Sequence, residues 1–476
     1  MANWTAAIVL ASVFFAGSGA IAQDTSEILD FIDARYESTA DMARTLWEFA
    51  EVGYQETRSS ALLQSELDRQ GFSIEAGIAG IPTAFVASYG SGGPVIGIIA
   101  EFDALPGINQ DALPLRSPIA GKAAGHACGH NLFSAGSVGA AIAVKHWLEE
   151  TGTPGTVQLF GTPAEEGGSG KVYIAREGHF DGVDIVLHWH AGDRNSAAAS
   201  TSLANRSGKF RFRGISAHAA GAPDKARSAL DGVEAFNHMV NLMREHVPQE
   251  TRIHYVITEG GNAPNVVPDF AEVFYYVRNP DAENVKAIWQ RLEAAALGAA
   301  QGTGTTVEWE IIHGSHSVLV NEALARMMDE KLRLVGGVGY NAHEQRFAEA
   351  IYATLDSPDL PLGSEQTIQP FEVTLGYHST DVGDVSMNVP TVGLRTATWV
   401  PGTASHSWQS TAASGMTIGY KGAQVAAKTL TLAAIELFQN EELRERATTE
   451  FHQRRGADFR YEALLGNRAP PLDYRN

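Results

Sequence analysis

Val95-Ile96-Gly97-Ile98-Ile99-Ala100 is a short apolar run that predicts a buried β-strand. Similar runs follow at residues 156–160 and 184–189, and a helical segment at 134–150 separates the first run from the second. Strands that alternate with helices of about ten residues or more indicate an α/β layer with a largely parallel sheet. We therefore expect side chains at the carboxyl ends of these strands to meet at one edge, where α/β sheets bind their ligands.

A different pattern begins near residue 206. Polar and apolar residues alternate at 209–213, 252–257 and 306–311, and helical segments lie between these runs. Alternation indicates strands with one solvated face, and hence an antiparallel sheet. We expect an inserted α+β domain at residues 206–316.

The rest of the chain should form one larger domain. A chain of 476 residues exceeds what a single hydrophobic core usually serves, so two domains are expected. The main α/β domain would comprise residues 23–205 and 317–476, with a mixed, largely parallel sheet. Single long helices are predicted at 26–50 and 419–450, and the last ten residues should be extended or loosely docked.

The N-terminal sequence indicates where the protein is located, and the net charge indicates which kinds of partner it does not bind. Residues 6–22 are apolar and end in Ala20-Ile21-Ala22, which fits a secretory signal peptide at 1–22, although no Lys or Arg precedes it. A buried or anchoring helix is the alternative. We expect a secreted or periplasmic protein without stable membrane insertion. The net charge of −20 argues against a nucleic-acid or anionic-membrane partner.

Gly125-His126-Ala127-Cys128-Gly129-His130-Asn131 contains the only cysteine. A thiolate and an imidazole two residues apart can face one metal ion, and Gly129 permits the tight turn that this requires. A lone buried cysteine is more often a small hydrophobic residue. Because Cys128 stands between two histidines and not in an apolar run, the sequence favours a ligand.

Further candidates follow predicted strands. Glu165 and Glu166 come after the strand at 156–160, where one carboxylate could bind metal and the other act as a general base. The alternative for this pair is a solvated acidic turn. His188 and His190 end the next strand. Only one of them need bind a metal, and the other would then be a hydrogen-bonded, partly buried histidine. Asp103, after the first strand, could orient a metal-binding imidazole.

Other chemistries lack their motifs in this sequence. It contains no Gly-x-Ser-x-Gly elbow, no Walker-type phosphate loop and no Gly-x-Gly-x-x-Gly dinucleotide turn. His406, in a turn-rich segment, is by itself a weak candidate.

Taken together, the motifs resemble those of the metallo-amidohydrolase family of aminoacylases, auxin-conjugate hydrolases and glutamate carboxypeptidases, most nearly the aminobenzoyl-glutamate hydrolase branch. The resemblance covers nearly all of the mature chain. The motifs that carry it are Glu101-Phe102-Asp103-Ala104-Leu105-Pro106, the 125–131 stretch, residues 163–168, Trp189-His190, Ser216-Ala217-His218-Ala219, Asn265-Val266-Val267-Pro268, Ser379-Thr380-Asp381-Val382-Gly383-Asp384 and His406-Ser407-Trp408.

The resemblance implies a catalytic domain with two divalent metal ions and an inserted lid that also forms a homodimer. By motif position, the metal ligands would be Cys128, His130, Glu166, His190 and His406. Thiolate and imidazole ligands favour Zn²⁺, with Mn²⁺ or Co²⁺ as alternatives. Carboxypeptidase relatives have a ligating His where this chain has Glu101, so the ligand set should follow the cysteine-containing branch.

The resemblance also assigns roles to non-ligands. Glu165 would deprotonate the metal-activated water and then protonate the leaving amine. His218 would reach the active site of a partner subunit and stabilise the oxyanion. Asn265 and Arg278 would bind substrate, and Asp103 would support a ligand.

We therefore expect a metal-dependent amidohydrolase that cleaves N-acyl or N-aroyl amino acids, such as aminobenzoyl-glutamate-like conjugates. The alternatives are a dipeptidase or carboxypeptidase of the same fold and a catalytically silent binding protein. The sequence leaves open the acyl group, the amino acid, the metal, the need for a different second subunit and the role of His188.

Overall fold

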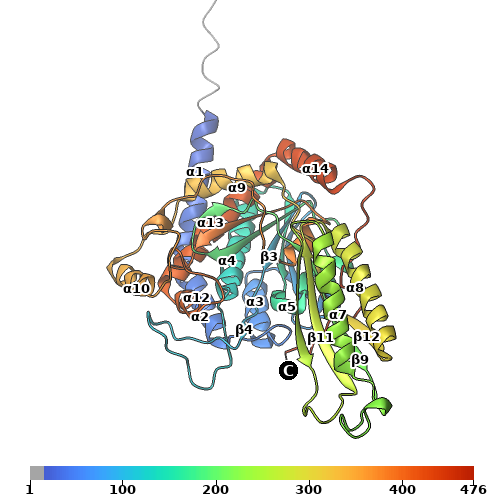
Figure 1. Ribbon diagram of the computed structural model, residues 1–476. Coiled ribbons are helices and arrows are strands. Elements are labelled where there is room, and N and C mark those ends of the chain that lie inside the picture. Colours follow the sequence, from blue (N-terminus) through green and yellow to red (C-terminus); the bar gives the residue numbers. More distant parts are fainter. Residues whose placement is uncertain (1–15, 476) are drawn as a thin grey trace, which may run out of the picture.

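The centre of the molecule is a seven-stranded sheet with the strand order β1-β2-β6-β3-β7-β13-β8, seen in a computed structural model that describes residues 16–475 (Figure 1). The strands are β1 (Ser73–Ala76), β2 (Phe85–Ser91), β3 (Val95–Ala100), β6 (Gly155–Gly161), β7 (Ile185–Gly192), β8 (Ser196–Ala197) and β13 (Thr391–Ala397). The four central strands, β6, β3, β7 and β13, pair in parallel, and the outer strands pair antiparallel. The predicted mixed, largely parallel sheet is confirmed.

Helices cover this sheet. They are α1 (Ala16–Ala34), α2 (Tyr36–Phe49), α3 (Thr57–Arg69), α4 (His130–Thr151), α5 (Glu165–Gly168), α6 (Gly170–Arg176), α9 (Glu322–Val335), α10 (Ala342–Tyr352), α11 (Val382–Ser386), α12 (Trp408–Ser414), α13 (Thr417–Gln439) and α14 (Glu441–Arg455). The helix α4 packs against the strands β3, β6 and β7 and against the helices α13 and α2, and α13 packs against the same sheet. The helix α4 is therefore buried along most of its length, which explains its largely apolar sequence.

Two predicted long helices are each divided. The segment expected as one helix at 26–50 contains the end of α1 and all of α2, and the segment at 419–450 contains parts of α13 and α14. The second break falls at Asn440, whose side chain accepts a hydrogen bond from the Leu443 N–H and so begins α14.

A second sheet takes its strands from the middle of the chain. Its antiparallel order is β10-β11-β9-β12, from β9 (Ala204–Arg213), β10 (Arg252–Glu259), β11 (Phe270–Asn279) and β12 (Thr306–Ser315). The helices α7 (Ala229–Met243) and α8 (Ala282–Thr303) pack on this sheet over a separate apolar core around Phe210 and Trp289. This confirms an additional sheet domain within an α/β fold, whereas its limits at 206 and 316 stay a prediction.

Three remaining features complete the fold. The short strands β4 (Leu105–Pro106) and β5 (Ala124–Gly125) form a small ladder of their own. The predicted signal at 1–22 lies outside the described residues as far as residue 15, and residues 16–22 begin α1. A search of the described helices reveals none with the length and apolar character needed to cross a bilayer.

Candidate active site

Six predicted side chains converge at the carboxyl edge of the parallel strands. Donor atoms of three overlapping trios lie within 4.8 Å of one another: Cys128, His130 and His190; Cys128, Glu166 and His406; and His130, Glu165 and Glu166. The residues come from β7, from the turns after β5 and β6, and from the segment before α12. Parallel strands bring these distant segments together because their carboxyl ends share one edge.

The turn at Gly129 aims the first two donors. Gly129 has φ of 76°, and a Cβ built there would lie 2.5 Å from the Cβ of Ala191 on β7. Only glycine fits both the left-handed conformation and the close approach. The turn starts α4 at His130 and leaves Cys128 beside His190, with Sγ 3.6 Å from Nε2.

The imidazoles are oriented by their other nitrogen atoms. The Nδ1 of His130 lies 2.9 Å from Asp103 Oδ1, and the Nδ1 of His190 lies 2.8 Å from the main-chain oxygen of Ala191. Each Nε2 therefore faces the cluster, the arrangement found for metal-binding histidines. Asp103 therefore lies against the predicted ligand His130, and its supporting role stays a prediction.

Two buried atoms of the cluster make no hydrogen bond among the described residues. They are His130 Nε2 and Glu166 Oε1, although Glu101 Oε2 and His406 Nε2, respectively, lie 3.1 Å from them. Buried polar atoms nearly always make hydrogen bonds, so this pair needs an explanation. A sulfur, imidazole nitrogens and a carboxylate gathered within 4.8 Å are the donors that a divalent transition metal prefers. The residues present fit such an ion.

The electrostatics of the site shift the pKa values of Glu165 and His190 in opposite directions. Burial, followed by the charges of Glu101, Glu166 and Asp381, raises the pKa of Glu165 well above its usual value. Burial and the neighbouring His130 lower the pKa of His190 to about 3, so its imidazole is neutral at pH 7. The carboxyl of Glu165 therefore keeps its proton to a higher pH than an ordinary glutamic acid does, and the neutral imidazole of His190 offers a lone pair.

A buried lysine borders the cluster, and sequence reasoning missed it. The fully buried Lys171 has its Nζ 2.7 Å from Glu101 Oε1 and 2.7 Å from Asp381 Oδ1. Burial opposes the charge, but Asp381 and Glu101 hold the pKa of Lys171 above its usual value. A signal was present: Lys171 precedes the apolar run Val172-Tyr173-Ile174, where a lysine is unusual.

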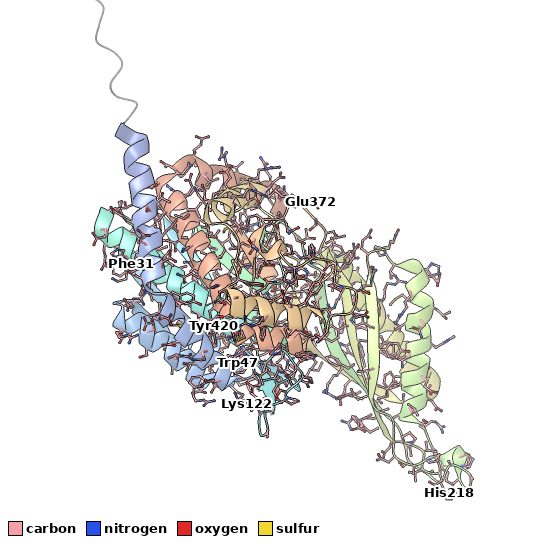
Figure 2. All side chains as sticks on the ribbon, turned by 90° about the vertical axis from the view of Figure 1, so that its left-hand side faces the viewer. Phe31, Trp47, Lys122, His218, Glu372 and Tyr420 are labelled. Carbon is pink, nitrogen blue, oxygen red and sulfur yellow. The ribbon has the colours of Figure 1, made fainter. Side chains whose placement is uncertain are left out.

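Two of the predicted site residues, His218 and Asn265, lie on the second-sheet domain and not in the cluster. Figure 2 shows His218 at the outer end of the second-sheet domain, where its imidazole is exposed. The neighbouring Ala219 N–H donates to the main-chain oxygen of Asn265, so His218 and Asn265 share this tip. Within residues 16–475, no hydrogen bond or ion pair joins either one to the cluster. Arg278 lies on β11, and His188, on β7, is not among the converging donors of the described residues.

Comparison with known proteins identifies the family of the chain. Residues 97–376 match the profile of "Peptidase family M20/M25/M40", which is more than half of the chain. The chain belongs to this family. The predicted family resemblance is thereby confirmed, as is the expectation of a hydrolase that acts on amide bonds.

Members of the family and related structures resemble most of the chain. It is 37% identical to a subunit of the p-aminobenzoyl-glutamate hydrolase of Escherichia coli, over 89% of this chain and 94% of that one. It is 28% identical to the Xaa-Arg dipeptidase of Mus musculus, over 88% and 90%. A dinuclear metal-binding M20 peptidase from Bacillus subtilis shares the fold, with a TM-score of 0.59 and 18% identity, over 86% and 99%.

Proposed function

We propose that this chain hydrolyses the amide bond of N-acyl or N-aroyl amino acids, with aminobenzoyl-glutamate-like conjugates as the substrate class. The observation that carries the proposal is the convergence of five donor side chains in overlapping trios, one of which, with His130 and Glu166, includes the carboxyl of Glu165. The name of the Escherichia coli relative, at 37% identity, supports the choice of substrate.

Two divalent ions would be held by Cys128, His130, Glu166, His190 and His406. The absence of a hydrogen bond at His130 Nε2 and at Glu166 Oε1, among the described residues, supports this ligand set. When bound, such a pair lowers the pKa of water and polarises a carbonyl group. The thiolate and imidazoles favour zinc, and manganese or cobalt are alternatives.

Glu165 would carry the proton. Its carboxylate would accept a proton from the attacking water and deliver it to the amide nitrogen as the C–N bond breaks. The products are a carboxylic acid and a free amine. The raised pKa of Glu165 supports this role, because a general acid or base works best when its pKa is shifted from the usual carboxyl range towards neutrality.

Substrate binding would involve the second-sheet domain. The buried Nε of Arg278 lacks a hydrogen-bond partner among the described residues. Burial, and after it the charge of Arg278, lowers the pKa of His313, which contacts the Ser169 hydroxyl beside the cluster. A substrate carboxylate would satisfy this guanidinium. His218 and Asn265 would act on the site of a second subunit, which makes a homodimer part of the proposal.

Two further parts of the proposal concern partners and location. The Escherichia coli relative is named as one subunit of its enzyme, so a different second chain is an alternative to a homodimer. The apolar run and Ala20-Ile21-Ala22 support export to the periplasm or the medium.

A dipeptidase is the second candidate, favoured by the 28% identity to the Xaa-Arg dipeptidase. The two candidates differ in whether the substrate has a free α-amine. Release of amine from matched N-aroyl amino acids and dipeptides distinguishes them.

The decisive variant is Glu165→Gln. It removes the proton carrier and keeps the size of the side chain, so amide hydrolysis should fall by at least about 100-fold while bound metal per chain stays unchanged. The measurements are amine release and metal analysis of the purified protein. Retained turnover in Glu165→Gln would remove Glu165 from its proposed role.

A further inference from the structure

The loop that carries Glu165 and Glu166 has an unfavourable backbone. Ala164 and Ser169, at its two ends, have φ of 57° and 62°, in the left-handed region that is unfavourable for a non-glycine residue. Such a conformation persists only where its surroundings hold it. We call residues 164–169 the catalytic loop.

Three contacts from the main domain hold this loop. The Ala164 N–H donates to Glu56 Oε1 at 2.9 Å, and the Glu166 N–H donates to Asp103 Oδ2 at 2.9 Å. The hydroxyl of Tyr54 donates to the main-chain oxygen of Gly168 at 2.6 Å. These contacts leave the main-chain oxygen of Glu166, at the centre of the loop, to be held from elsewhere.

That oxygen is held by the C-terminal segment. The Tyr474 hydroxyl donates to the Glu166 main-chain oxygen at 3.0 Å, and the guanidinium of Arg475 donates to the same atom. Figure 1 shows the C-terminal end of the ribbon near α5. The contact is closely fitted, because a Cβ at Gly53 would lie 2.4 Å from the Tyr474 hydroxyl oxygen.

The same segment is fastened along its length to the domains of both sheets. Leu464 is fully buried in the core of the second-sheet domain, whereas its neighbours Ala463 and Leu465 belong to the main core. The guanidinium of Arg468 donates to the main-chain oxygens of Ile311 and Ile312 on β12, each at 2.7 Å. The segment is therefore docked and not loose.

A second cation fixes the segment from the main domain. Arg176, at the end of α6, donates to the main-chain oxygens of Gly466 and Arg468 at 3.0 and 2.9 Å. The Gln55 amide donates to the Leu472 oxygen at 2.8 Å, just before Tyr474. These contacts fix the main chain just ahead of Tyr474 and Arg475, and so position both side chains against the loop.

We propose that residues 461–475 are a positioning strap, in which Tyr474 and Arg475 hold the Glu166 carbonyl and so fix both carboxylates of the catalytic loop. Tyr474 and Arg475 are positioning residues, because they act through the main chain of Glu166. Loss of partners that orient metal ligands typically lowers metal affinity or activity by about 10- to 100-fold. The kinetic consequence rests on the proposed hydrolase function, whereas the order of the loop does not.

The test compares Tyr474→Phe, Arg475→Met and the double variant with Asn467→Ala, an exposed residue of the same strap whose side chain makes no hydrogen bond to the described residues. We expect kcat to fall about 10- to 100-fold in the double variant, with KM within twofold and the melting temperature as in the control. We also expect faster amide hydrogen exchange in a peptide spanning 163–170, and a changed visible spectrum of the cobalt-loaded protein.

Each outcome decides one of the two proposals. Exchange at 163–170 and a cobalt spectrum equal to those of Asn467→Ala would overturn the strap, whatever the activity. A fall in kcat that is accompanied by a fall in melting temperature, with unchanged hydrogen exchange in the loop, would also overturn the strap, because it would indicate a general structural role. A wild-type protein without amidase activity but with faster loop exchange in the double variant would keep the strap and reject the hydrolase function.

Discussion

Lys171 shows at the scale of one residue how the site tolerates crowded carboxylates. Glu101, Glu165 and Asp381 lie near one another, and burial together with like charge makes such a group costly. The ammonium of Lys171 bridges Glu101 and Asp381 at 2.7 Å from each. The cation therefore offsets the charge of two groups behind the donor cluster.

Lys171→Met should leave these two buried carboxylates without their partner. We expect the free energy of unfolding to fall by about 3–5 kcal/mol, the usual cost of breaking a buried ion pair from one side. Urea unfolding measures it. The matched control is Lys286→Met, which removes a partly exposed pair with Glu283 and should cost no more than about 1 kcal/mol. Similar losses in both variants would contradict the buried network.

The sequence indicated the candidate donors and the nearby Asp103 but not the more distant supports, and the reason is physical. Cys128 and His130 lie on a glycine turn and the other candidates at strand ends, so local patterns pointed to them. The family resemblance then distinguished Glu166 from Glu165 and His190 from His188. The partner of Lys171, Asp381, is 210 residues away, and Tyr474 is 308 residues from Glu166. Contacts over such separations depend on the packed fold and leave no periodic or local signal.

At the scale of elements, glycine turns decide where the donors point. Gly129, before α4, lies against Ala191 of β7, whereas Gly152, after the same helix, has a similar φ of 63° with nothing near its missing side chain. The two positions separate backbone strain from steric contact.

Gly129→Ala should lower the free energy of unfolding through both backbone strain and steric contact. Left-handed backbone costs an alanine about 1–2 kcal/mol, and the contact with Ala191 adds about 1–3 kcal/mol of overpacking. We expect Gly152→Ala to lose only the first amount. Chemical denaturation compares the two, and metal analysis should show a loss only in Gly129→Ala. Equal stabilities of the two variants would show that β7 does not constrain the turn.

Element prediction succeeded where the hydrophobic pattern was continuous. Residues 95–100 were predicted as a strand and coincide with β3, and the helix predicted at 134–150 lies within α4. The strands β11 and β13 were not singled out. In β13 a glycine and an arginine interrupt the apolar run, and its pairing with β7 comes from tertiary packing.

At the scale of the whole molecule, the exposed tip carries His218 and Asn265, which are predicted to act at an active site but make no hydrogen bond or ion pair with the described donor cluster of their own chain. Figure 2 shows His218 at the outer end of the second-sheet domain, a position that fits a role across a dimer interface. The sequence predicted the two-sheet architecture, but the arrangement of subunits lies beyond a single chain.

Mixing two inactive variants tests this arrangement. Glu165→Gln lacks the proposed proton carrier, and His218→Ala lacks the proposed oxyanion donor. If His218 acts across the interface, a mixed dimer has one complete site, so random exchange should restore roughly a quarter of wild-type activity. Amine release after subunit exchange is the measurement. No recovery, with exchange verified by mass, would indicate that His218 does not act across subunits.

The most direct test of the central claim is anomalous diffraction at the zinc edge from crystals of the zinc-loaded protein. The account predicts two anomalous peaks among Cys128 Sγ, His130 Nε2, His190 Nε2, Glu166 and His406. Crystals from fully loaded solutions with no peak among these atoms, or with zinc bound only elsewhere, would contradict it.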